Sequence, residues 1–203
     1  MFSFKAFIDH LLRMRRYFAF SAILFFAGVI VGGTNPAFEG YLDRQLEGIG
    51  DIAGMIDNSS NPTLFMFLFI FLNNTVKSIM VMYLGAAFAV VPLLFLLLNG
   101  MILGYLFTSL GESGQNAAAV FLKGILPHGI IEIPAILIAC AYGLKFGMLS
   151  FRAIGSLVSR REGIGKEYEF FAVRTVPVIL FLIVALLAAA VIESTLTVWL
   201  ISL

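Results

Sequence analysis

Two ionisable residues stand inside an apolar stretch of this chain, Leu126–Ile138, which reads LPHGIIEIPAILI. His128 and Glu132 are four residues apart, so in a helix they share a face, about one turn from each other. An imidazole and a carboxylate at this spacing can bind one metal ion, and histidine also exchanges protons near neutral pH. The spacing therefore predicts a site for a divalent cation or a proton.

Prolines and a glycine surround this pair. Pro127 suits the start of a helix, and Pro134, two residues after Glu132, removes a backbone hydrogen bond, which favours a kink. We expect the helix to break near Pro127, with Gly129 beside the break. A charged side chain at the centre of a bilayer costs at least ~2.5–3.5 kcal/mol, so these groups should face one another or a wet cavity.

The composition requires a membrane environment for this stretch. Of the 203 residues, 61% are hydrophobic and 12% are charged, whereas a soluble domain is about half apolar and about a quarter charged. Several apolar runs reach the ~20 residues that cross a bilayer. We expect an all-α fold: one polytopic membrane helix bundle over residues 1–203, with broken or kinked helices and amphipathic surface helices. About five spans are expected, at 17–33, 62–83, 86–110, 117–144 and 175–200.

The segments outside these spans also have a helical period. Residues 1–16 predict an interfacial helix, residues 34–61 an outer amphipathic helix, and residues 145–173 an amphipathic helix on the cytoplasmic surface. Asn61-Pro62 should cap the second span, because Asn is a good N-cap and Pro fits the first helical position. His10 is expected at the cytoplasmic surface, where it is a poor candidate for a metal ligand.

The basic residues predict the orientation. Residues 1–16 hold four of the 13 Lys and Arg residues and residues 145–174 hold six, whereas residues 34–61 hold Arg44 alone. By the positive-inside rule both basic segments face the cytoplasm. We therefore expect a multi-pass protein of the cell membrane with its N-terminus in the cytoplasm and its C-terminus outside.

The polar residues inside the spans predict one cluster in the bundle, made of Asn73, Asn74, Lys77, Asn99, His128 and Glu132. One interpretation is structural: the asparagines hydrogen-bond across helices, and Glu132 pairs with Lys77. The other is functional: His128 and Glu132 bind a cation or relay a proton. Two ligands are too few for zinc, so a metal ion needs a third ligand from another helix or another subunit.

Glycine spacing predicts close helix contacts. Gly28 and Gly32 in the first span, and Gly100 and Gly104 in the third, have the small-xxx-small spacing that lets helices approach closely. Pro92 and Asn99-Gly100 are expected to interrupt the third span. No catalytic residues are predicted, because the chain lacks a His-Glu-x-x-His motif and a recognisable nucleophile.

The same residues carry a resemblance to a known family. Asn73-Asn74, Asn99-Gly100 with Gly104, and the run Pro127-His128-Gly129 with Glu132-Ile133-Pro134-Ala135 resemble the stage II sporulation protein M family. The resemblance implies a five-span membrane protein. In endospore-forming bacteria the named member anchors a complex with two peptidoglycan-degrading partners that drives engulfment, and it acts there as a scaffold. Similar proteins occur in organisms that form no spores, so no sporulation role is carried over, and neither are catalytic residues.

Two functions follow as hypotheses. The first is a non-enzymatic membrane scaffold or assembly protein, which binds partners through residues 34–61 and 145–173. The second is a small transporter or channel-like protein in which His128, Glu132 and the asparagines line a path for an ion or solute, since broken helices form such sites. The expected partners are the lipid bilayer, a second copy of the chain and other membrane or envelope proteins, with no nucleic acid.

Overall fold

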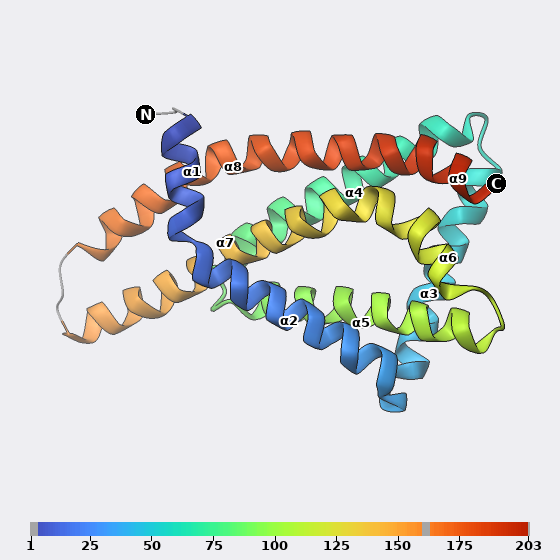
Figure 1. Ribbon diagram of the computed structural model, residues 1–203. Helices are drawn as coiled ribbons and strands as arrows, with labels where there is room; N and C mark the ends of the chain where they lie inside the picture. Colours follow the sequence, from blue (N-terminus) through green and yellow to red (C-terminus); the bar gives the residue numbers. More distant parts are fainter. Residues whose placement is uncertain (1–3, 160–162, 203) are drawn as a thin grey trace.

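The structure is a computed structural model that describes residues 4–159 and 163–202. Regular structure in these residues is entirely helical (Figure 1). The long helices are α2 (Arg15–Thr34), α4 (Pro62–Leu84), α5 (Val90–Glu112), α7 (Leu126–Ser159) and α8 (Ile164–Ile192). The shorter ones are α1 (Phe4–Arg13), α3 (Glu39–Asp57), α6 (Ala117–Val120) and α9 (Val198–Ser202). Two π-helical segments, Phe121–Ile125 and Glu193–Thr197, join α6 to α7 and α8 to α9.

Five continuous helical stretches are long and apolar enough to cross a membrane: Arg15–Thr34, Pro62–Leu84, Val90–Glu112, Ala117–Ser156 and Ile164–Ser202. Their outer faces stay apolar, as a helix in lipid requires. On α2, for example, Ile23, Phe26 and Ile30 expose 57–68% of their surface. The predicted all-α membrane bundle is confirmed. Helices α1 and α9 lie at opposite ends of the bundle, as an odd number of crossings requires (Figure 1).

The two glycine pairs meet in a single helix–helix contact between α2 and α5. A Cβ on Gly32 would overlap the carbonyl group of Met101, and one on Gly104 would overlap the carbonyl oxygen of Val29. The backbones touch where larger residues would hold them apart. The hydroxyl of Thr108 closes the contact by donating to the carbonyl oxygen of Gly33, at 3.0 Å.

A second core joins α7, α8 and α1 through aromatic rings. Tyr142, Phe146 and Phe171 are buried, and the rings of Phe146 and Phe171 are 4.8 Å apart. His10 belongs to this core: its ring centroid lies 5.6 Å from that of Tyr142, and 9% of the residue is exposed. His10 is therefore buried between helices instead of exposed to solvent, because α1 folds back against α7 and α8.

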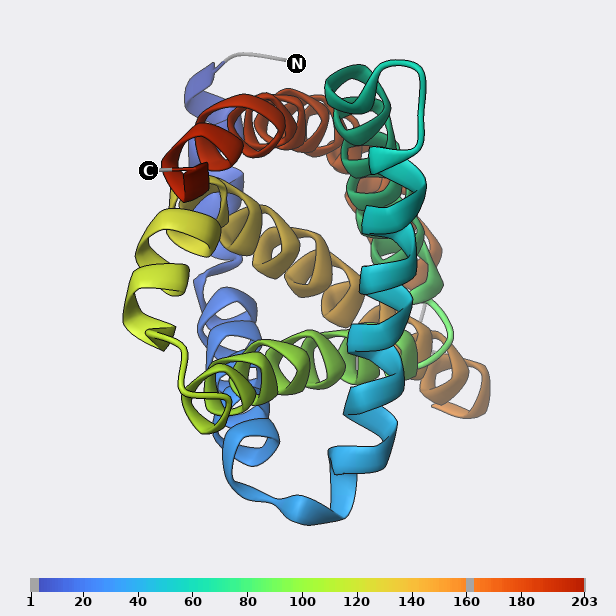
Figure 2. The ribbon, with the colours of Figure 1, turned by 90° about the vertical axis from the view of Figure 1, so that its right-hand side faces the viewer.

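The polar segment between α2 and α4 forms a helix, α3, that crosses one end of the bundle. Figure 2 shows α3 running over the end at which α5 and α6 meet. Leu42 is fully buried beneath it, and the hydroxyl of Tyr105 on α5 donates to Asp43 at 2.5 Å. The predicted cap of α4 is confirmed, because the side-chain oxygen of Asn61 accepts from the backbone N–H of Leu64 at 3.1 Å.

Two expectations about helix continuity are wrong. Helix α5 runs without interruption from Val90 to Glu112, because Pro92 falls in its first turn, where no intrahelical N–H is needed. The described part of residues 145–173 does not form a separate surface helix: residues 145–159 continue α7 and residues 164–173 begin α8. Lys145 and Arg152 both reach Glu167, at 3.5 and 3.4 Å, and these ion pairs join α7 to α8 near the loop between them.

Candidate metal centre

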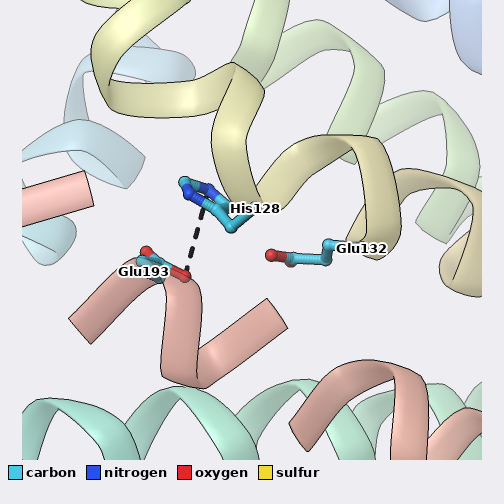
Figure 3. A group of neighbouring side chains, drawn as sticks. All are labelled: His128, Glu132 and Glu193. Carbon is cyan, nitrogen blue, oxygen red and sulfur yellow. Dashed lines mark ion pairs between the residues drawn. The ribbon is translucent and has the colours of Figure 1, made fainter. Parts of the chain in front are cut away.

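Three ionisable side chains converge inside the bundle. His128 lies in the first turn of α7, Glu132 follows one turn later, and Glu193 begins the π-helical segment at the end of α8 (Figure 3). One ligand atom from each lies within 4.8 Å of the others. His128 Nε2 lies 3.9 Å from Glu193 Oε2, with 13% and 23% of the two side chains exposed. The site is thus partly buried and combines one imidazole with two carboxylates.

The π-helical segments give both helices the local geometry that the site uses. Pro127 has no N–H to donate to the carbonyl group of Lys123, and the preceding turn widens so that the N–H of Leu126 reaches the carbonyl oxygen of Phe121. The expected break near Pro127 is therefore a π-helical turn, Phe121–Ile125, within a continuous helical stretch, and α7 is helical from Leu126 onward through Pro134. Such wide turns occur frequently at functional sites.

Thr197 completes the surroundings of His128. Its Oγ1 lies 3.4 Å from His128 Nδ1, while Nε2 of the same ring points toward Glu193. Thr197 and Glu193 are the two ends of one π-helical segment, so a single element contacts both ring nitrogens. A partner on the second nitrogen fixes the ring orientation of a ligating histidine. The arrangement leaves Nε2 as the nitrogen available to a cation.

The donor set suits a divalent transition-metal ion. Imidazole and carboxylate ligands are shared by zinc, manganese and iron, and sites with three protein ligands keep a position open for water or substrate. Ligands at ~2.0–2.2 Å from a metal ion lie ~3–3.6 Å apart, so the three side chains must close by about 1 Å to share one ion. Rotation of the glutamate side chains can supply a movement of this size. The residues present fit such an ion.

A polar cavity of about 240 Å³ adjoins the site at Glu132. Its lining comes from four helices, α4, α5, α7 and α3, and α3 contributes Tyr41 and Gln45. The cavity volume is sufficient for water, and its polar lining offers water the partners it needs. Of the residues singled out in the sequence, those that line it are Asn73, Asn74, Lys77, Asn99 and Glu132.

The structure divides the predicted polar cluster in two. His128 is outside the cavity lining and faces Glu193 instead. Within residues 4–159 and 163–202 no ion pair joins Lys77 to Glu132. The asparagines bond locally: Asn73 donates to Asn74 at 3.1 Å, and Asn99 donates to a carbonyl oxygen of its own helix at 2.7 Å.

The glycine and proline positions have separate structural roles. Gly100 and Gly104 lie in the contact with α2. A Cβ on Gly129 would meet side-chain atoms of Ile125 and Ile133 at 3.6 and 3.8 Å, which are ordinary contacts. Packing alone therefore does not require a glycine at position 129. Pro134 lies exposed inside the continuous helix α7.

Glu193 and Thr197 are the site residues that sequence reasoning missed. The available signal was a carboxylate near the end of a long apolar span, since such a group needs a partner. No periodicity, however, connects the end of α8 with the start of α7. The pairing depends on how the two helices pack, which one chain's sequence does not reveal.

Comparisons with known proteins place the chain among membrane proteins of one family. The profile of the family described as "Stage II sporulation protein M" matches residues 18–198. An uncharacterized protein of Methanocaldococcus jannaschii is 28% identical over 138 residues, which cover 68% of this chain and 58% of the relative. This chain thus spans less than two thirds of that relative's length. No solved structure matches.

Proposed function

The chain belongs to the stage II sporulation protein M family, and we propose that it binds a divalent transition-metal cation inside the membrane. The ligands are His128, Glu132 and Glu193. The observation that carries the proposal is the convergence of these three side chains, from two different helices, within 4.8 Å. An uncompensated pair of neighbouring carboxylates inside a membrane is costly, and a bound cation removes that cost.

The cavity gives the ion a route to the site. Glu132 belongs to the cavity lining and to the metal centre alike, so an ion in the cavity meets a ligand directly. Tyr41 and Gln45 of α3 also line the cavity, and α3 crosses the end of the bundle that the positive-inside rule assigns to the outside. We infer entry from that side. This supports the ion-transport hypothesis over a closed structural network of Asn, Lys77 and Glu132.

A scaffold role is the second candidate, supported by family membership and by one surface. Glu47 and Asp51 lie exposed on α3, which crosses the end of the bundle. An acidic helix in this position can dock an envelope protein or a second copy of the chain. The metal centre is compatible with this role, in which the ion would hold α7 and α8 together.

Metal binding is tested on purified protein in detergent, stripped with chelator and titrated with Zn²⁺, Mn²⁺ and Co²⁺. About one ion per chain is expected by elemental analysis, with a Co²⁺ absorption spectrum typical of mixed nitrogen and oxygen ligands. E193Q and H128Q should lose both signals, whereas E112Q, at an exposed glutamate at the end of α5, should keep them. Binding by E193Q with unchanged affinity would refute the site.

Transport is tested separately in liposomes that enclose a metal-sensitive dye. Metal-dependent fluorescence that requires Glu132 and Glu193 is expected if the ion crosses the membrane. Normal binding in detergent without any flux would reject transport and leave the ion its structural role between α7 and α8. The two experiments therefore separate binding from passage.

A further inference from the structure

A cationic hollow lies at the elbow between α1 and α2, far from the metal centre. It has a volume of about 490 Å³ and is lined by Leu12, Arg13, Arg15 and Arg16. Among the described residues none of these three arginines takes part in an ion pair, whereas Lys145 and Arg152 nearby share Glu167. Three adjacent guanidinium groups repel one another, and their fork of N–H donors fits a phosphate.

An apolar groove of about 670 Å³ begins at the same elbow. It runs between α2, the turn after α4, α5 and α7, and its walls include Phe20, Leu93 and Met148. Arg16 lines both the groove and the cationic hollow, and it is the charged residue in the groove lining. The apolar groove therefore begins directly beside the cationic hollow and its three arginines.

The wall of the groove is built by an unusual turn. Phe88 and Ala89 have positive φ values of 56° and 62°. Residues other than glycine rarely adopt this backbone conformation. The turn persists because Gly147 on α7 lets the backbone of Ala89 approach so closely that a Cβ there would overlap it. The ring of Phe88 packs against that of Phe151, with centroids 4.9 Å apart. The groove is thus a fixed feature of the fold.

We propose that this hollow and groove bind one anionic phospholipid, with its phosphate at the three arginines and one acyl chain in the groove. The groove lies along three of the helices that can span the membrane, and Arg16 lies at the start of one of them, where lipid headgroups lie. A lipid therefore meets both parts without leaving its leaflet. A soluble anion would use the hollow alone, and a neutral lipid the groove alone.

The charges predict a strong headgroup preference. Each basic residue near a membrane surface favours anionic lipid by roughly fivefold at low salt. For delipidated protein in detergent we expect dioleoyl phosphatidylglycerol to bind at least ~10-fold more tightly than dioleoyl phosphatidylcholine, measured by native mass spectrometry. In the triple variant R13Q/R15Q/R16Q the two lipids should bind equally. K123Q, at an exposed lysine at the opposite end of the bundle, should keep the preference.

A groove variant tests the apolar part. M148W, at a half-exposed lining residue, should weaken binding of both lipids alike, with an unchanged unfolding temperature that shows an intact fold. The proposal is overturned if the wild type binds both lipids equally or if the triple variant keeps the preference. It is also overturned if M148W breaks a dimer while lipid binding persists, since a second copy would then occupy the groove. None of these outcomes depends on the metal centre.

Discussion

His128 and Glu193 come from different helices, yet the imidazole Nε2 of one lies 3.9 Å from a carboxylate oxygen of the other. A ligand that binds both must pull the end of α8 toward the start of α7. The two helices are adjacent along much of their length, and the ion would fasten them at one end. Several measurable consequences follow from this contact and from the packing around it.

Metal binding should stabilise the folded protein. A ligand at 100 times its Kd adds about 2.7 kcal/mol to the free energy of unfolding, which corresponds to a rise of several degrees in a chain of this size. We expect this rise on addition of Zn²⁺ or Mn²⁺ to chelator-treated protein, followed by the fluorescence of Trp199. The unfolding temperature of E193Q should not rise on addition of metal, and that of E112Q should rise as much as that of the wild type. An equal rise in E193Q would contradict the assignment.

Thr197 should tune metal affinity without binding the ion. T197V removes the hydroxyl beside His128 Nδ1 and should weaken binding by roughly 10–100-fold, as loss of a partner to a ligating histidine does. Thr195 offers a matched control in the same π-helical segment, since it is exposed and its hydroxyl bonds only to its own helix. T195V should therefore bind metal like the wild type. Titration calorimetry on both variants distinguishes this role from general loss of structure.

The close contact between α2 and α5 should not tolerate a larger residue in place of Gly104. G104L forces a side chain against the backbone of Val29 and should destabilise the protein by about 1–3 kcal/mol or more. Gly111, on the same helix, has open space around it, so G111A should be close to neutral. Thermal unfolding in detergent measures both changes. A neutral G104L would mean that the two helices are less closely packed than described.

His10 should make stability depend on pH. Burial, followed by the positive charges of Arg174, Arg13 and Lys145, lowers the pKa of His10 below its usual 6.5. The folded state thus takes up a proton less readily than the unfolded state. The stability that neutral His10 contributes is complete above about pH 6.5 and declines as the pH falls below it.

Replacement of His10 by phenylalanine checks this sign. H10F keeps an aromatic ring against Tyr142 and Phe171 but cannot take up a proton. Between pH 7.5 and pH 5 its unfolding temperature should fall less than that of the wild type, in metal-free protein. H128Q serves as the comparison, because it removes the other histidine and leaves His10 in place. An identical fall in H10F and wild type would show that His10 does not control this range.

Local patterns determined much of this protein. Runs of about 20 apolar residues specify the spans, Asn61-Pro62 specifies a helix start, and a spacing of four places His128 and Glu132 on one face. The charge asymmetry between residues 1–16, 145–174 and 34–61 predicts the orientation as well. The helix start and the shared face depend on neighbours within one or two helical turns, and the spans and the charge asymmetry depend on composition along the chain, so the sequence states all of them directly.

Tertiary packing decided which residues from different helices meet. Among the described residues Glu193 reaches His128, and Lys77 does not pair with Glu132. Backbone contacts, such as that of Gly104 on α5 with Val29 on α2, set how far two neighbouring helices are shifted along and rotated against each other. In a membrane all outer faces are apolar, so hydrophobicity does not distinguish one helix register from another. Close backbone contact does, and it appears only when the helices are assembled.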